Sequence, residues 1–348
     1  MANFLSTILC VAVITTVIMT AIFRWVAHDL DIVDKPDNHV KTHTKPTAYL
    51  GGCAIFTGFL IAYGYALIWH NSLLNQIPCA IHALLIGGSL AMCVLGLLDD
   101  LKDISPLKKI LGQTILALIF VFLMQNTTGG SVHRFDSSLC WVLMSGLTWI
   151  CLVGAMNSIN LLDGLDGLCA GIAAIISLGF GLLSLFCSSD NSMINLIAAT
   201  ALLGVTAGFL VFNYYPASIF MGDSGSLFVG YIFAFQIIHF FSISISAFLA
   251  ALMIFGLPIL ECSVAILRRW LNNRDIFLSD RGHIYDQLID RGYSIIKAVW
   301  FCYGLSVFYT AVGLFGLIFH WRLAIVIYIA VMLISFAIIW KMGFLKKV

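Results

Sequence analysis

The sequence predicts an all-α, polytopic integral membrane protein with about eleven transmembrane helices. Its 348 residues are 61% hydrophobic and only 10% charged, with a mean hydropathy of +1.02. Soluble domains carry about 25% charged residues. Apolar runs long enough to cross a bilayer, about 17–25 residues each, recur along the whole chain. We therefore expect residues 1–348 to form a single transmembrane domain, and the net charge of +1 gives no reason to expect nucleic acid as a partner.

The expected spans follow one another with short connections. They fall at 4–25, 50–69, 79–98, 107–125, 139–157, 167–187, 193–212, 224–241, 244–267, 296–319 and 322–341. The first run lacks a basic leader and is too long for a signal peptide, so we expect it to stay as a helix. The ten cysteines lie mostly inside apolar runs, where they behave as small hydrophobes and indicate neither disulfides nor a metal site.

Charge predicts the orientation. With the N-terminus outside and the C-terminus in the cytosol, only Arg134 and Arg322 of the 18 basic residues fall on the outer side, as the positive-inside rule requires. Of the 17 acids, Asp136 and Asp190 lie outside, and Glu261 is the sole glutamate and sits within a span. The other aspartates gather on the inner side. This predicts metal and phosphate chemistry at the cytosolic face of the membrane.

The first inner loop, 31–52, is basic and contains helix-breaking prolines. Lys41, His43 and Lys45 are candidate phosphate contacts. The alternative is an ordinary basic loop that obeys the topology rule, and the loop alone does not decide between the two.

The segment LDDLKD places Asp99, Asp100 and Asp103 at the inner end of the third span. Adjacent carboxylates repel each other at a lipid boundary unless a cation is near. That cation would be Lys102 or the Mg²⁺ of a bound phosphate. Solvated helix-end charges are the alternative.

The stretch NSINLLDGLDGL, 157–168, lies between two apolar runs and carries polar side chains three residues apart. They are Asn157, Asn160, Asp163 and Asp166. If the segment is helical, this spacing puts all four on roughly one face. Asn and Asp at interior helical positions oppose helix propensity, so we interpret the stretch as the floor of a site and not as an incidental polar loop.

The segment YYPASIFMGDSGSLFVG, 214–230, places Asp223 among glycines and serines where a helix begins. Backbone N–H groups at such a start favour an anion, and Asp223 could hold a cation. Phe220 could lie against a base ring. A helix start that is simply well capped is the alternative.

The longest inner loop, 267–294, is rich in arginine and contains His283. Arginine side chains, Arg281 among them, suit phosphate recognition. His283 is a candidate catalytic residue, and a purely structural histidine is the alternative. Together the inner clusters predict a nucleoside diphosphate held through Mg²⁺, or Mn²⁺ in its place, with a lipid as the second substrate.

The order LDDLKD, NSINLLDGLDGL, FMGDSGS and then a basic loop with histidine resembles the polyprenyl-phosphate N-acetylhexosaminyl-1-phosphate transferases. This family includes the enzymes that start O-antigen, enterobacterial common antigen and teichoic acid assembly, and the phospho-N-acetylmuramoyl-pentapeptide transferase. The resemblance covers about residues 30–295. It implies Mg²⁺-dependent transfer of a sugar 1-phosphate from a UDP-sugar to undecaprenyl phosphate or another polyprenyl phosphate, with release of UMP. GlcNAc 1-phosphate is the transferred group that we expect. The resemblance implies that this is the first membrane step in the synthesis of an envelope polysaccharide, at the cytosolic face of a bacterial plasma membrane. Whether the protein forms a homodimer is left open.

By motif match, the resemblance implies roles for eight of these residues. Asp99 and Asp100 would be the paired catalytic aspartates, and Asp163 would be a third catalytic residue. Asp100 would also lie near the metal. A Mg²⁺ ligand would be Asp223, and Asn160, Asp163 and Asp166 would lie at the nucleoside and metal end. Phe220 would lie near the uracil, and His283 would be the first histidine of the loop motif.

Two departures concern substrate recognition. The loop motif is typically His-x-His-His in the common-antigen and teichoic-acid branch, but here it reads His283-Ile284-Tyr285-Asp286. That loop is linked to sugar recognition in the family, so another UDP-N-acetyl sugar such as a FucNAc or QuiNAc donor is the alternative. In addition, the first inner loop has only Lys41 before His43, where the family has an Arg-Lys pair.

The expected chemistry is attack by a lipid phosphate oxygen on the β-phosphorus of the UDP-sugar. A phosphate monoester is already mostly dianionic at neutral pH, so positioning and charge neutralisation should dominate over general-base help from Asp99. A two-step route through an aspartyl-phosphate is the mechanistic alternative. From another class, a secondary transporter would place polar groups near the bilayer midplane, and only Glu261 beside Pro258 fits that.

Overall fold

The computed structural model describes residues 2–35, 46–69, 77–127, 138–187, 192–275 and 282–345. Within these ranges nearly all the regular structure is helical. The predicted phosphate contacts Lys41, His43, Lys45 and Arg281 lie outside the described residues.

Each of the eleven predicted spans corresponds to helix in the structure. Ten are single helices long and apolar enough to cross a membrane, and the ninth is a pair of shorter helices bent by 64°. The long helices are α1 (Ala2–Asp29), α2 (Gly51–Trp69), α4 (Cys79–Lys102), α5 (Pro106–Thr127), α6 (Ser138–Asn160), α7 (Leu168–Cys187), α8 (Met193–Asn213), α9 (Gly222–Ile243), α13 (Ile295–Gly316) and α14 (Trp321–Lys341).

The bent pair consists of α10 (Ile245–Ile254) and α11 (Gly256–Leu271). Phe255 separates them, and Pro258 lies in the first turn of α11, where a missing backbone N–H costs no helical hydrogen bond. Helix α11 ends in Arg268 and Arg269, both buried. Helix α9 is separated from α10 only by Ser244, which caps α10 by accepting the Ala247 N–H. The prediction that 224–241 and 244–267 are separate segments is therefore confirmed.

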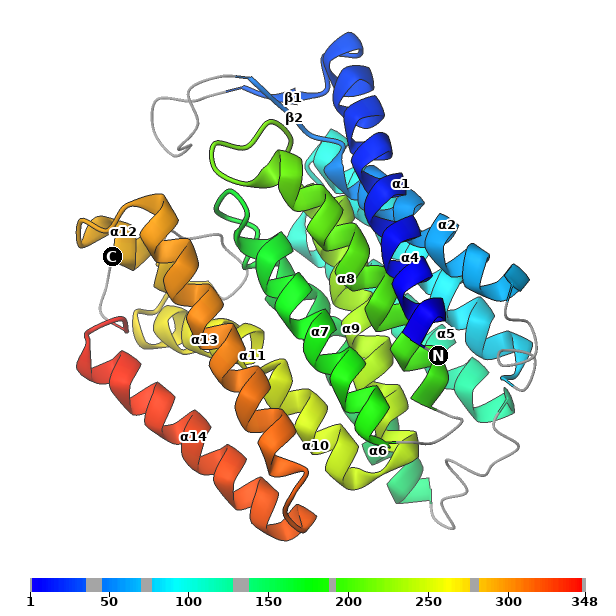
Figure 1. Ribbon diagram of the computed structural model, residues 1–348. Coiled ribbons are helices and arrows are strands. Elements are labelled where there is room, and N and C mark those ends of the chain that lie inside the picture. Colours follow the sequence, from blue (N-terminus) through cyan, green and yellow to red (C-terminus); the bar gives the residue numbers. More distant parts are fainter. Residues whose placement is uncertain are drawn as a thin grey trace.

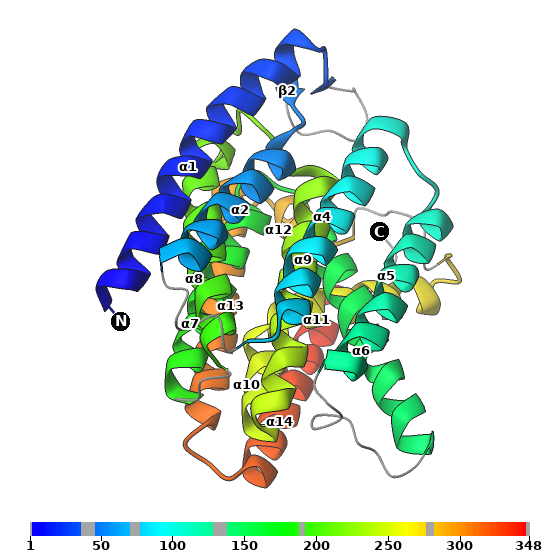
Figure 2. The same ribbon diagram turned by 90° about the vertical axis from the view of Figure 1, so that its right-hand side faces the viewer.

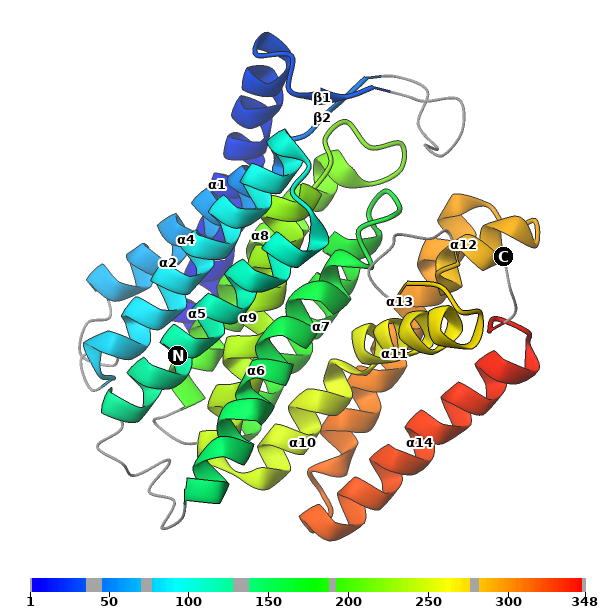
Figure 3. The ribbon, with the colours of Figure 1, turned by 180° about the vertical axis from the view of Figure 1, so that it is seen from behind.

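Helix α9 is the centre of the bundle. Every residue from 224 to 240 is buried, because α2, α4, α6, α8 and α10 all pack against it. Figures 1 and 3 show α7, α8 and α9 running side by side, with α13 and α14 on one flank. Peripheral helices such as α5 and α14 expose large apolar side chains, which is expected of surfaces that face lipid.

A small hairpin and a short helix cover one end of the bundle. Strand β1 (Val33–Asp34) pairs antiparallel with β2 (Thr47–Ala48), and Ala48 also bridges to Ile219. The short helix is α12 (Ile284–Asp290). Figure 2 shows β2 between the upper end of α1 and the start of α2. The sequence predicted neither element, because each is too short to give a periodic pattern.

Candidate active site

The carboxylate of Asp100 caps helix α9. Asp100 lies in the last turn of α4, and its Oδ1 accepts the backbone N–H of Asp223 at 2.8 Å while Oδ2 accepts that of Ser224 at 3.0 Å. The N–H groups that were expected to favour an anion are thus engaged by an anion of the chain itself. As a consequence, two motifs 123 residues apart are fixed against each other.

Asp223 and Asp99 converge on one cation, the ammonium group of Lys109. Lys109 Nζ lies 2.8 Å from Asp99 Oδ2 and also donates to Asp223 Oδ2. Asp99 is held further by the Ile104 N–H, which donates to Oδ1 at 2.7 Å. Lys109 lies in the first turn of α5. The connection between α4 and α5 therefore brings its side chain back to the aspartates at the end of α4.

Asn160 orients Asp223 from the other side. Its Nδ2 donates to Asp223 Oδ1 at 2.5 Å and to Ser226 Oγ at 2.9 Å. Asn157, one turn earlier, donates instead to Gln113 Oε1 at 2.7 Å and to the Val153 carbonyl. Helix α6 ends at Asn160, so the predicted four-residue helical face does not form, and Asn157 joins α6 to α5.

Residues 161–167 form a turn that carries the other two aspartates, Asp163 and Asp166. Asp166 Oδ2 accepts the Ala217 N–H at 2.8 Å, which ties this turn to the loop before α9. Gly167 has φ +75°, a left-handed conformation that glycine adopts without strain, and it starts α7. The backbone N–H of Gly222 donates to Asp163.

Burial raises the pKa of the Asp163 carboxyl well above its ordinary value, and the negative charges of Asp223 and Asp100 raise it further. The Gly222 N–H opposes this shift only in part. Several carboxylates therefore share one end of the bundle with a single ammonium group in contact with two of them. Such a cluster is stabilised by an added cation.

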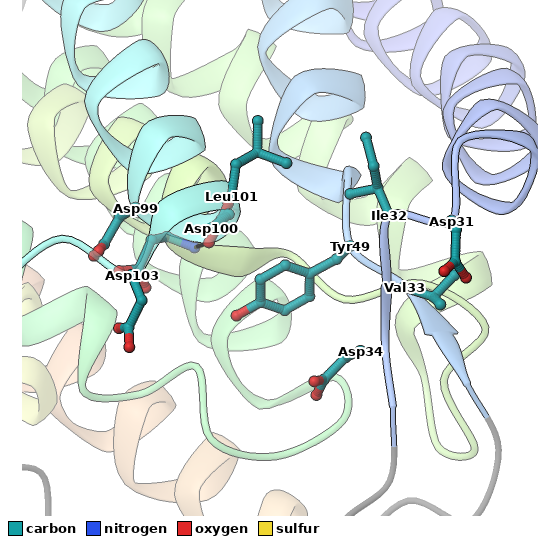
Figure 4. Close-up of a pocket in the computed structure, with 10 residues that line it drawn as sticks. Asp31, Ile32, Val33, Asp34, Tyr49, Asp99, Asp100, Leu101 and Asp103 are labelled. Atoms are coloured by element: carbon teal, nitrogen blue, oxygen red, sulfur yellow. Dashed lines mark hydrogen bonds between the residues drawn. The ribbon is translucent and has the colours of Figure 1, made fainter.

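The aspartates line a pocket of about 560 Å³. Figure 4 shows Tyr49 crossing it, with the hydroxyl directed toward the aspartates of α4. Burial, followed by the charges of nearby aspartates, raises the pKa of Tyr49, so its hydroxyl stays a hydrogen-bond donor. The described lining residues are Asp31, Ile32, Val33, Asp34, Tyr49, Asp99, Asp100, Leu101, Asp103 and Asp223.

Phe220 lies beside this pocket. Its ring meets Tyr49 edge-on at a centroid distance of 6.3 Å. Its backbone N–H donates to the Ala48 carbonyl at 2.9 Å, and its carbonyl accepts the Gly51 N–H. The hairpin thus fixes two aromatic rings at the pocket edge, where a planar base could pack.

His283 is buried and paired with Glu261. Its Nδ1 lies 2.8 Å from Glu261 Oε1, and the same carboxylate accepts the Ile284 N–H at 3.1 Å. Glu261, the one acidic residue whose position fitted the transporter alternative, therefore caps the start of α12. Tyr285 stacks on His283 and donates its hydroxyl to the Leu161 carbonyl at 3.0 Å, which places α12 against the 161–167 turn.

The donor set fits Mg²⁺ that is completed by a substrate. No three His, Cys, Asp or Glu side chains converge in metal-ligating geometry in the part of the chain that is described. Mg²⁺, however, usually takes only one or two protein carboxylates and fills its other positions with phosphate oxygens and water. Asp99 and Asp223 are two such carboxylates that already share one cation.

Sequence reasoning missed Lys109, Tyr49 and Tyr285 as residues of this site. Lys109 and Asp223 are 114 residues apart, and no local spacing signals such a pair. Tyr285 was noted only as a departure from a family pattern. A lysine placed a few residues into a span that follows an aspartate pair is a signal that could have been used, since it is costly to bury unless it is paired.

Fold and site together define a polytopic membrane protein with an aspartate-lined pocket at one end of its helical bundle. The sequence model of glycosyl transferase family 4 matches residues 82–241. The chain is 33% identical over 308 residues to a probable undecaprenyl-phosphate N-acetylglucosaminyl 1-phosphate transferase of Bacillus subtilis (strain 168), covering 85% of this chain and 82% of the relative. The chain belongs to this family of polyprenyl-phosphate N-acetylhexosaminyl-1-phosphate transferases.

Two further relatives represent other branches. A decaprenyl-phosphate N-acetylglucosaminephosphotransferase of Mycobacterium tuberculosis (strain ATCC 25618 / H37Rv) is 28% identical, with 87% of this chain and 81% of the relative covered. A phospho-N-acetylmuramoyl-pentapeptide-transferase of Oceanobacillus iheyensis is also 28% identical, with 83% and 91% covered. The family expected from the motifs is confirmed.

Proposed function

We propose that this protein transfers GlcNAc 1-phosphate from UDP-GlcNAc to a polyprenyl phosphate, undecaprenyl phosphate in a bacterial plasma membrane, and releases UMP. The observation that carries the proposal is the convergence of Asp99, Asp100 and Asp223 on one pocket, with Asn160 bound to the Asp223 carboxylate. The relatives named for GlcNAc transfer support the choice of sugar. Another UDP-N-acetyl sugar is the alternative, because Tyr285 and Asp286 stand where the family has histidines.

The pocket faces the cytosol in this proposal. Helix α14 begins with Arg322 at the end far from the pocket and finishes with Lys341 near α12. Lys102, Lys109 and Arg269 lie at the pocket end. This segregation supports the orientation expected from the positive-inside rule.

Mg²⁺ would be held by Asp223 and Asp99, with Asp163 close by, and it would supply neutralisation of the diphosphate and of the leaving UMP. Lys109 would move from its carboxylate partners to the substrate phosphates as they enter. Tyr49 and Phe220 would pack beside the uracil. Asp166 and Asn160 would keep the 161–167 turn and Asp223 in register.

Direct attack by the lipid phosphate fits the geometry better than a covalent aspartate. Both oxygens of Asp100 accept backbone N–H groups, and both oxygens of Asp99 have partners. Phosphorylating either residue would break these bonds. The two routes differ in a measurable exchange: a phosphoenzyme would exchange labelled UMP into UDP-GlcNAc without lipid, and direct transfer would not.

Purified protein in nanodiscs, supplied with undecaprenyl phosphate and Mg²⁺, tests the proposal. It should release UMP and form the sugar-diphospholipid with UDP-GlcNAc faster than with UDP-GalNAc or a 6-deoxy donor. Chelation should stop the reaction, and Mn²⁺ should restore part of it. No UMP from any donor, together with substrate accumulation in sealed proteoliposomes, would favour the transporter alternative.

A further inference from the structure

The chain that follows α14 folds back toward the bundle. Gly343, with φ +79°, ends the helix, and the Phe344 N–H donates to the Ile339 carbonyl at 3.1 Å. This is the pattern in which a left-handed glycine turns the chain at a helix C-terminus. Phe344 is 2% exposed, whereas Trp340 on the preceding turn is 70% exposed. Residues 342–345, here called the C-terminal clasp, thus turn away from the lipid-facing surface, and the last two of them, Phe344 and Leu345, are buried.

One side chain of α12 and the C-cap side chains of α12 and α11 bind the clasp through its carbonyl groups. Gln287 Nε2 donates to the Phe344 carbonyl at 2.8 Å, and Asn272 Nδ2 donates to that of Leu345 at 3.3 Å. Arg291 Nη2 donates to the Met342 carbonyl at 2.7 Å, and its guanidinium lies 4.0 Å from the centroid of the Phe344 ring. Three of the four clasp carbonyls are therefore held by side chains. Figure 3 shows the end of α14 turning up beside α12.

Gln287 connects the clasp to the histidine segment. An amide NH₂ has two N–H donors, and Gln287 uses the second one on the Gly282 carbonyl at 2.9 Å. Gly282 directly precedes His283. The side chain is 6% exposed, so losing either bond would leave a carbonyl group buried without that donor.

Helix α12 depends on contacts from outside itself. It has seven residues, too few to be stable alone. On one side Tyr285 bonds the Leu161 carbonyl of the aspartate turn. On the other side the clasp holds Gln287 and Arg291. His283 therefore lies at the start of a short helix that is held between the 161–167 turn and the clasp that follows α14.

We propose that the C-terminal clasp positions α12 and His283 for binding of the UDP-sugar, with Gln287, Arg291 and Phe344 as positioning residues. This inference rests on the proposed function. If α12 is correctly placed in only a fraction of the molecules, the apparent affinity for the ligand it contacts falls by that fraction. Loosening the clasp should therefore raise KM for the sugar donor. It should leave KM for the lipid phosphate and kcat almost unchanged.

Gln287→Glu is the sharpest variant, because it keeps the shape and replaces two donors by a carboxylate that faces two carbonyl groups. Asp290→Asn is its control, a charge change of the same size and opposite sign at an exposed position of the same helix. Phe344→Ala is paired with Trp340→Ala, which removes an aromatic ring from the lipid-facing side of α14. Phe344→Tyr keeps the ring and should rescue donor binding.

We expect Gln287→Glu and Phe344→Ala to raise KM for UDP-GlcNAc about tenfold, with kcat and the lipid KM within about twofold of wild type. Hydrogen exchange of residues 282–290 should accelerate in both variants and in neither control. Arg291→Ala, a change at an exposed residue, serves if the buried variants do not fold. It should also raise the donor KM without changing kcat or the lipid KM, but by a smaller factor.

A donor KM within twofold of wild type in Arg291→Ala and in every variant that folds would overturn the clasp proposal. A fall in kcat together with equal rises in the donor KM and the lipid KM would also overturn it, because that pattern indicates general destabilisation. The hydrogen-exchange readout needs no turnover. A wild-type protein without transferase activity but with clasp-dependent protection of α12 would remove the proposed function and keep the physical coupling.

Discussion

The carboxylate of Asp100 accepts the backbone N–H of Asp223 at 2.8 Å, so the first helix-end aspartate pair and the start of α9 form one unit. This bond does not need a bound substrate. It fixes the Asp223 side chain at the pocket before any cation arrives.

Asp100→Asn should therefore destabilise the protein even without Mg²⁺. An amide can accept only one of the two N–H groups that Asp100 binds, and losing a helix cap costs about 1 kcal/mol. Thermal unfolding in Mg²⁺-free detergent buffer is the measurement. An unchanged Tm in Mg²⁺-free buffer would contradict the capping role of Asp100.

Asp223→Asn should abolish Mg²⁺-dependent turnover, with a loss of about a hundredfold or more, because a preorganised charge at the reacting phosphates is removed. The Tm without Mg²⁺ should not fall much, since the backbone bond to Asp100 survives. Initial rates of UMP release across a Mg²⁺ series provide the check. Near-normal turnover in this variant would remove the role assigned to Asp223.

Lys109→Met should lower turnover and also shift the Mg²⁺ requirement. Its ammonium group occupies the space between Asp99 and Asp223, so it competes with a metal ion for the same oxygens. Removing it should reduce the Mg²⁺ concentration for half-maximal binding on the order of tenfold. The exposed neighbour Lys108, changed in the same way, is the control, and isothermal titration of both variants decides the matter.

Asn160→Ala and Asn157→Ala should separate two roles that look alike in the sequence. Asn160 orients Asp223 at 2.5 Å, and losing such a supporting bond typically costs about 10–100-fold in activity. Asn157 binds Gln113, so its loss should lower Tm more than kcat/KM. If the two variants lose equal activity at equal stability, Asn157 acts on substrate as the motif suggested.

Gly96→Ala should displace the start of α9. A Cβ at this position would lie 2.3 Å from the Asp223 carbonyl oxygen, which is backbone and cannot swing aside. Overpacking of this kind costs about 1–3 kcal/mol, and activity should fall with it. Gly87→Ala on the same helix meets nothing within 4 Å and should keep both Tm and UMP release. Parallel behaviour of the two variants would mean that this approach is not tight.

The spans were predictable because the bilayer imposes a length and a composition that soluble folds do not. The aspartate motifs could be selected as candidate site residues because a charged side chain at a lipid boundary is costly unless it has a partner or a function. The prediction that four polar residues of 157–168 share one helical face was wrong. Helix α6 stops at Asn160, and the turn that follows aims Asp163 and Asp166 by bonds to the 217–222 segment.

The sequence by itself determined the membrane-spanning helices, the family and the set of carboxylates, since each depends on local composition or on a contiguous motif. Only the tertiary structure decided which of those groups meet. Lys109 contacts Asp99 and Asp223, Glu261 pairs with His283, and the end of α14 holds Gln287. The physical reason is that these contacts join helices far apart in the chain, and packing around α9, which no local pattern encodes, sets their distances.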